Sequence, residues 1–277
     1  MAGFDLHTHT TYSDGTTSPE DNVADAVALG LEGLGVTDHD TTDGFERARA
    51  AADATDLELV LGTEFSAEHN GWSVHVLGYW IDPGHAPLAD ELARLRDERT
   101  DRARRIVERF NELGVPISFE QVARLAGEAP IGRPHLAQAV VEVGAAADVR
   151  EVFDRYLADG GPAYVEKHAV SPDRAIELLT AAGGVAVLAH PGLYGPMREG
   201  MDATQVERMA AAGLAGIEAD HPDHTDAQRH GYRDLAAGLG LEVTGGSDYH
   251  GDPTTNPLGC STTPREVVER LRGWVRA

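Results

Sequence analysis

A short apolar segment followed by an amphipathic one recurs along most of this chain, and this alternation restricts the folds that the chain can adopt. Segments that fit buried strands cover residues 4–6, 31–36, 57–61, 72–80, 185–189, 214–218 and 241–244. Helix patterns cover residues 18–29, 42–54, 202–212 and 225–239, start again at 171, and close the chain after Thr263-Pro264. Strands that alternate with helices at this spacing imply parallel strands joined by crossover helices. The pattern therefore predicts an α/β barrel.

Residues 87–165 break this alternation, because no series of strands is expected there. A long charged helix over 88–113 precedes a break at 115–117 and short helices over 119–125, 134–143 and 149–157. The segment predicts a helical insertion subdomain, with the barrel domain built from residues 1–86 and 166–277. The long helix carries seven arginines between Arg94 and Arg109, and seven acidic residues also lie along it. We interpret it as a solvated helix face, not as a stripe that binds nucleic acid.

Composition excludes several classes of protein. The chain has 277 residues and a single cysteine, Cys260, so it has neither an intrachain disulfide nor a cysteine-rich zinc module. Its 46 acidic and 23 basic residues give a net charge of −23, which should repel long nucleic acid. The longest mostly apolar stretch, 181–189, is far shorter than the roughly 20 residues of a membrane span, and the N-terminus has no signal-like run. We expect a cytoplasmic protein with no membrane partner and no stable complex with long nucleic acid.

The first fifteen residues hold a pair of histidines with the spacing of a chelate. His7 and His9 are two residues apart after an expected strand, so both side chains should project to the same side. Asp14 precedes Gly15, which lets the chain turn, and its carboxylate can close on the same site from a loop. Taken alone, the pair fits equally well with two exposed histidines near a flexible N-terminus.

Further His and carboxylate residues lie where the expected strands end. His7, His9, Asp38, His39, Glu64, His190, Asp248 and His250 lie at or just past the carboxyl ends of different strands, and His75 lies within one. Active sites of parallel α/β barrels are built at this end of the strands. The remaining histidines, such as His69, His85, His224 and His230, are expected to be solvent-exposed.

So many potential ligands exceed what a single metal ion needs. A catalytic zinc site uses three protein ligands and a water, so nine ligands fit two or three clustered ions. Imidazole together with carboxylate favours zinc, manganese or iron over calcium. Three divalent ions with three carboxylates would leave an excess positive charge of roughly three. A phosphate monoester is the anion that we expect there, attacked by hydroxide that the metals generate by lowering the pKa of water towards ~7.

Six motifs, in this order along the chain, carry a resemblance to a known family. They read DLHTHTTYSDG, VTDHDT, GTEFS, VHVLGY, LAHPG and GGSDYHG. They resemble the motifs of the PHP (polymerase and histidinol phosphatase) family of metal-dependent phosphoesterases, over residues 4–80 and 171–260. The resemblance implies a distorted (β/α)7 TIM-like barrel with a trinuclear metal site. Its implied ligands are His7, His9, Asp14, His39, Glu64, His75, His190, Asp248 and His250, none of which is substituted here.

The chain is most similar to small family members that have a helical insertion after the fourth strand. Some of these remove the 3′-phosphate from nucleotide 3′,5′-bisphosphates, and relatives trim RNA from the 5′ end. The resemblance therefore implies a small phosphorylated substrate, a nucleotide or a short oligoribonucleotide. The rival interpretations are a phosphatase for a small metabolite such as histidinol phosphate, and a regulatory module that binds metal without turnover.

Substrate contacts are expected mainly in the insertion. The stretch Gly132-Arg133-Pro134-His135 is similar to one in the small members, so Arg133 and His135 are candidate phosphate contacts, with Lys167 and His221 behind them. The alternative roles for these residues are a surface salt bridge or a helix cap. The candidate catalytic residues are Asp248 and His221, and His221 is the candidate general acid for the leaving hydroxyl.

Overall fold

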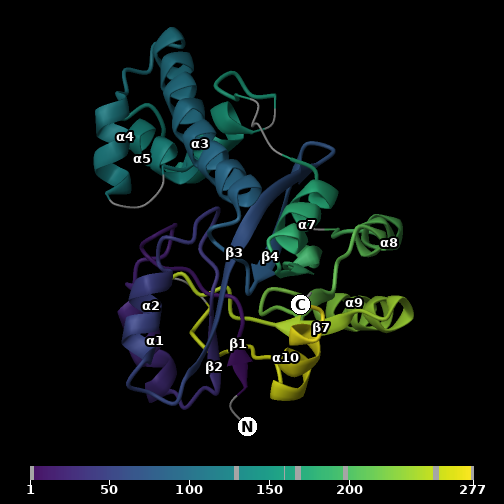
Figure 1. Ribbon diagram of the computed structural model, residues 1–277. Coiled ribbons are helices and arrows are strands. Elements are labelled where there is room, and N and C mark those ends of the chain that lie inside the picture. Colours follow the sequence, from purple (N-terminus) through teal and green to yellow (C-terminus); the bar gives the residue numbers. More distant parts are fainter. Residues whose placement is uncertain are drawn as a thin grey trace. The chain divides into compact units, whose positions relative to one another are not determined.

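The computed structural model of the protein describes residues 3–127, 131–158, 160–165, 170–195, 199–251 and 256–275. The chain forms two compact units, one from Met1–Leu92 with Ala169–Ala277 and the other from Ala93–His168 (Figure 1). That the second unit is a separate insertion subdomain with limits at residues 87 and 165 stays a prediction. None of the helices within the described ranges combines the length and apolar character that a membrane span requires.

One seven-stranded sheet, in which each strand lies beside the next along the chain, forms the first unit. Its strands are β1 (Phe4–Asp5), β2 (Gly33–Val36), β3 (Glu58–His69), β4 (Trp72–Tyr79), β5 (Val185–Leu188), β6 (Gly216–Asp220) and β7 (Glu242–Gly245). The predicted α/β barrel is confirmed. The expectation of parallel strands is wrong at β4, which pairs antiparallel with both β3 and β5. The reason is the dipeptide Asn70-Gly71, whose φ angles of 52° and 84° form a tight hairpin turn.

Thr263 closes the barrel between its first and last strands. Its backbone exchanges hydrogen bonds of 2.7 and 2.8 Å with Phe4 in β1. Its hydroxyl accepts a hydrogen bond from the Gly245 N–H and donates one to the Gly245 carbonyl in β7, both at 2.8 Å. The pattern Thr263-Pro264 predicts a helix cap, but helix α10 (Arg265–Arg272) begins after Pro264 without a side-chain cap. The threonine joins strands instead.

Helices of the first unit connect the strands. They are α1 (Pro19–Ala28), α2 (Phe45–Ala52), α7 (Pro172–Ala181), α8 (Ala203–Ala211), α9 (Asp226–Leu239) and the short 3-10 helix η2 (Pro191–Leu193). The predicted N-caps of α1 and α7 are present, since the Ser18 and Ser171 hydroxyls accept backbone hydrogen bonds at 3.1 and 3.3 Å. Under the helices, buried strand residues such as Phe4, Leu77 and Val187 form the core. This core supports the carboxyl ends of the parallel strands.

The second unit is helical, and the predicted helical insertion between β4 and β5 is confirmed. It contains most of the long helix α3 (Ala86–Glu112), then α4 (Phe119–Ala126), α5 (Arg133–Glu142), α6 (Val149–Val152) and the π-helical segment η1 (Phe153–Leu157). Its own core includes the buried side chains of Phe110, Leu136, Val140 and Leu157. A separate core of this kind makes the unit compact in its own right.

Candidate metal centre

The candidate ligands reach one region of the first unit from six of its strands. His7 and His9 follow β1, His39 follows β2, His190 follows β5, and Asp248 and His250 follow β7. Glu64 does not follow a strand as the pattern predicts, because β3 continues as one arm of the hairpin to His69. Glu64 is two residues from Ser66, which pairs with His75 in β4, so the carboxylate and the imidazole share a face of the sheet.

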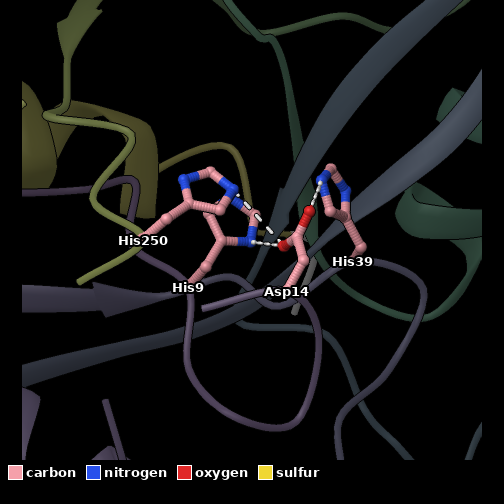
Figure 2. Close-up of side chains that lie close together, drawn as sticks. All are labelled: His9, Asp14, His39 and His250. Atoms are coloured by element: carbon pink, nitrogen blue, oxygen red, sulfur yellow. Dashed lines mark ion pairs between the residues drawn. The ribbon is translucent and has the colours of Figure 1, made fainter. Parts of the chain in front are cut away.

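One group of ligands surrounds Asp14. Its Oδ1 atom lies 3.6 Å from His9 Nδ1 and 3.3 Å from His250 Nε2, and its Oδ2 atom lies 3.6 Å from His39 Nε2 (Figure 2). Four ligand atoms from these side chains lie within 4.8 Å of one another, which is the spacing of groups that share a metal ion. The loop carboxylate thus lies beside His9, one member of the histidine pair, and its role as a ligand stays a prediction.

Glu64 is the common neighbour of the other ligands. Its Oε1 atom lies 2.8 Å from His75 Nδ1 and 2.9 Å from His190 Nε2, and its Oε2 atom lies 3.0 Å from His39 Nδ1. Two more groups with metal-ligand spacing contain it, His7–His9–Glu64–Asp248 and His39–Glu64–His75. Because the three groups share members, they form one continuous cluster.

Buried ligand atoms that lie close together without hydrogen bonds indicate that this cluster fits metal ions. His7 Nε2, His9 Nε2, His39 Nδ1, Glu64 Oε2 and His190 Nδ1 are buried and have no hydrogen-bond partner among the described residues. Each buried polar atom without a partner costs about 1–3 kcal/mol, so several together need compensation. Divalent cations bound by imidazole and carboxylate would provide it. The cluster can therefore hold metal ions.

In the absence of metal ions, the pKa values of the cluster residues depend strongly on one another. Burial would raise the pKa of the Glu64 and Asp248 carboxyls, but the neighbouring imidazoles outweigh it and hold both pKa values well below their usual range. Burial would lower the pKa of His9, but contacts with Asp248 and Glu64 raise it to about 10. Burial dominates at His39 and lowers its pKa to about 4. A metal ion must therefore displace protons from part of the cluster when it binds.

Two acidic residues outside the three ligand groups contact the histidine pair: Glu218, which the sequence did not indicate, and Asp38, which the strand-end pattern placed among the potential ligands. Glu218 in β6 is buried, and its carboxylate oxygens lie 3.0 and 3.2 Å from His7 Nδ1. On the other side, the Ser13 hydroxyl lies 3.3 Å from His9 Nδ1 and donates a 2.6 Å hydrogen bond to Asp38. Both Nε2 atoms therefore face Glu64 and Asp248, while Nδ1 of His7 contacts Glu218 and Nδ1 of His9 lies near Ser13 and Asp14.

Two further residues brace the ligand loops. The Tyr194 hydroxyl accepts the His75 N–H at 2.8 Å and donates to the Ala189 carbonyl at 2.9 Å. The expectation that His224 is solvent-exposed is wrong, because its ring is buried. Its Nε2 accepts the Gly192 N–H at 3.0 Å, and its Nδ1 lies 2.9 Å from a carbonyl oxygen at the end of β6. The histidine therefore ties the loop after β5 to β6.

The predicted substrate residues divide between the units. His221 is buried, and its Nε2 lies 3.5 Å from Asp248 Oδ2, so it joins the metal cluster. Arg133 and His135 belong to the second unit, at the start of α5. His135 Nδ1 accepts the backbone N–H of the N-cap residue at 3.1 Å, which makes it part of a helix cap. Lys167 lies outside the described residues.

An α/β barrel with a His and carboxylate cluster at the ends of its strands is typical of metal-dependent hydrolases. A family model for the PHP domain matches residues 5–96. The chain is 36% identical to a 3′,5′-nucleoside bisphosphate phosphatase of Chromobacterium violaceum, over 90% of this chain and 88% of that protein. It is 34% identical to the 5′-3′ exoribonuclease Rnm of Escherichia coli, over 89% of this chain and 85% of that protein.

Solved structures give the same result. A protein of Bifidobacterium adolescentis described as a metal-dependent phosphoesterase superposes with a TM-score of 0.87 and 34% identity, over 100% of this chain and 97% of that one. The chain therefore belongs to the PHP family and is a metal-dependent phosphoesterase.

Proposed function

We propose that this enzyme removes the 3′-phosphate of nucleoside 3′,5′-bisphosphates, using two or three divalent ions of manganese, zinc or iron. The observation that carries the proposal is the continuous cluster of His and carboxylate groups joined through Glu64. Similarity over nearly the whole chain to a nucleoside bisphosphate phosphatase supports the choice of substrate. Short RNA, trimmed from its 5′ end, is the second candidate, supported by the similarity to a 5′-3′ exoribonuclease.

The nine residues predicted from the sequence are the proposed ligands, and Glu64, which belongs to two of the ligand groups, would be the carboxylate that bridges ions. Bound divalent ions would supply hydroxide at neutral pH and neutralise the charge of the transferring phosphate. Asp248 has a second proposed task. Its Oδ1 atom lies 3.4 and 3.3 Å from the Nε2 atoms of His7 and His9, while Oδ2 faces His221. It would thereby connect the metal ligands to the proton donor.

His221 is the proposed general acid for the leaving ribose hydroxyl. Its Nδ1 accepts the Asp223 N–H at 3.2 Å, so the neutral ring carries its proton on Nε2. That nitrogen is buried, has no hydrogen-bond partner among the described residues and faces Asp248. From the other side, the Arg229 guanidinium donates to the backbone carbonyls of His221 and Pro222 at 2.9 and 2.8 Å, which holds the loop in place. Nε2 of His221 is therefore the atom that would donate a proton to the leaving hydroxyl.

Replacing His221 by Gln is expected to lower kcat by about 10²–10⁴-fold for a ribose 3′-phosphate, the usual contribution of general acid catalysis. An aryl phosphate such as p-nitrophenyl phosphate has a leaving group that departs without a proton, so its kcat should fall by less than about tenfold. Both rates would be measured with the same metal-saturated protein. An equal loss for the two esters would mean that His221 positions Asp248 and donates no proton.

Selectivity for a doubly phosphorylated substrate is assigned to Arg133. Its guanidinium lies 5.8 Å from the centre of the Phe153 ring. A planar guanidinium can bind a phosphate bidentately, which a lysine cannot do. We propose that it binds the phosphate that is not hydrolysed, with His135 as a second candidate contact and with Lys167 and His221 behind them.

The substrate is tested by comparing kcat/KM for adenosine 3′,5′-bisphosphate, adenosine 3′-monophosphate, histidinol phosphate and a 5′-phosphorylated trinucleotide. We expect the bisphosphate to exceed the monophosphate by about 10–100-fold, the effect of one charge-assisted contact of about 1.5–3 kcal/mol. Arg133→Ala should raise KM mainly for the bisphosphate, and Arg124→Ala, which removes an exposed arginine paired with Glu142, is the control. Equal values for the two nucleotides, or a higher value for histidinol phosphate, would contradict the proposed substrate and leave the phosphoesterase activity in place.

A further inference from the structure

Strand β6 contributes none of the nine proposed ligands, although it lies between two strands that lead into ligands. It carries Glu218, whose carboxylate is completely buried beside the cluster. Removing a carboxylate from water is unfavourable unless its oxygens are well paired. The partners of Glu218 therefore indicate why an acidic residue occupies this position.

The first partner is the side chain of His7. Its Nδ1 lies 3.0 Å from Oε1 and 3.2 Å from Oε2 of Glu218. An ionised carboxylate only accepts hydrogen bonds, so Nδ1 must carry the proton of the neutral ring. In this neutral form, which a metal ion requires, the lone pair is on Nε2, the atom that lies 3.3 Å from Glu64 Oε2 and 3.4 Å from Asp248 Oδ1. The contact selects the tautomer of His7 that can bind metal.

The second partner is the backbone of His190. Its N–H donates a 2.9 Å hydrogen bond to Oε2 of Glu218. His190 has a φ angle of +23°, which residues other than glycine rarely adopt, and it begins the tight turn of η2. A backbone in such a region persists only where its surroundings hold it. The hydrogen bond to Glu218 holds this strained residue while its Nε2 faces Glu64 at 2.9 Å.

The backbone that follows β7 approaches the contact between Glu218 and His7 closely. A Cβ atom at Gly246 would lie 2.4 Å from the His7 Cβ and 2.7 Å from Oε1 of Glu218. Only glycine fits there, so the backbone just after β7 packs against the contact between Glu218 and His7. The carboxylate is therefore enclosed on this side.

We propose that Glu218 is a positioning residue of the metal centre, which orients His7 through its side chain and His190 through its backbone. One carboxylate thereby sets two ligands that reach the cluster from β1 and β5. The inference rests on the proposed metal centre and is independent of the substrate. Carboxylates that hydrogen-bond to metal-binding histidines commonly contribute 10–100-fold to metal affinity.

The test compares Mn²⁺ binding by the wild type, Glu218→Gln and Glu218→Asp. Gln has the same shape but only one acceptor oxygen, and Asp keeps the charge but is too short to reach both partners. We expect about 10-fold weaker binding of at least one ion for Gln and up to about 100-fold for Asp, measured by competition with a chelating dye. The matched control is Glu242→Gln, which removes a carboxylate that pairs with Arg270 at the start of β7.

A second readout separates positioning from a merely structural role. Mn²⁺ raises the Tm of a protein that binds it only when folded, and weaker binding makes that rise smaller. In the Glu218 variants, we expect a smaller Mn²⁺-induced rise than in wild type or Glu242→Gln. If both variants lower the Tm equally with and without Mn²⁺ and keep wild-type affinity, Glu218 is structural and the inference is overturned. Absence of Mn²⁺ binding in the wild type would contradict the metal centre itself, and the role of Glu218 with it.

Discussion

Replacing Asp248 by Asn is expected to lower kcat/KM by about 10³-fold or more while the protein remains folded. The side chain keeps its shape but loses the negative charge that faces the Nε2 atoms of His7, His9 and His221 at 3.3 to 3.5 Å. In the proposed site this change removes a charged metal ligand and the partner of the general acid together. Loss of one preorganised electrostatic group alone commonly costs about 10²–10³-fold.

Asn is the informative substitution at this position for a conformational reason. Asp248 has a φ angle of 54°, a left-handed conformation that Asn tolerates and that would strain Ala. The side chain is 21% exposed at the rim of the site, so the buried strands below it should stay packed. A loss of activity can therefore be attributed to the missing charge and not to unfolding.

The matched control is Asp173→Asn, which removes a carboxylate that pairs with Arg208 on the surface of α7. Surface ion pairs contribute about 0–1 kcal/mol, so its kcat/KM should equal the wild-type value. Both variants would be assayed at saturating Mn²⁺ after circular dichroism has shown that they are folded. An Asp248→Asn enzyme with more than a tenth of wild-type kcat/KM would remove this residue from the mechanism.

The ligands that could be predicted from the sequence are those that directly follow an expected strand. His7 and His9 stand two residues apart after an apolar segment, and His190 and Asp248 follow β5 and β7 in the same way. In a parallel barrel the carboxyl ends of all strands meet, so local pattern alone places these residues together. Glu64 was also predicted as a ligand, but its position at the end of a strand was wrong. It lies inside β3, which continues to the hairpin turn at Asn70-Gly71.

The residues that support the ligands were not predictable, because their roles depend on neighbours far away in the sequence. Glu218 contacts His7 across 211 positions, and Tyr194 contacts His75 across 119. Neither residue has a characteristic spacing from its partner, and β6 reads as an ordinary buried strand. The prediction that His224 is exposed was wrong for the same reason. Its ring is buried and accepts a hydrogen bond from Gly192, which lies in another loop.

Removing the metals is expected to abolish turnover and to make the stability of the protein depend on pH in a defined direction. In the metal-free protein the pKa of His9 is raised to about 10 and that of His7 well above 6.5, because the contacts with carboxylates outweigh burial. In the unfolded chain both residues titrate near 6.5. Between these values the folded protein holds protons that the unfolded chain has released, so the free energy of unfolding decreases as pH rises.

At lower pH, the free energy of unfolding should change with pH in the opposite direction. Glu64 and Asp248 have lowered pKa values in the folded protein, so they contribute stability above their ordinary pKa values, and this is lost as pH falls through them. His39, with a pKa of about 4, is neutral when folded but protonated when unfolded below 6.5, which also lowers stability as pH falls. The metal-free protein should therefore be most stable near pH 6.5.

Bound metal should reverse the upper part of this profile. Metal ions require deprotonated imidazoles, so their binding strengthens as pH rises, while the metal-free protein loses about 1.4 kcal/mol per pH unit for each retained proton. We expect the Tm difference between Mn²⁺-loaded and chelator-treated protein to widen steadily from pH 6.5 to 8.5. Elemental analysis should find two or three ions per chain in the loaded protein, and restored Mn²⁺ should restore turnover. A metal-free Tm that is constant or rises over this range would show that His7 and His9 do not retain their protons, and would contradict the tight coupling of the pair to Glu64 and Asp248.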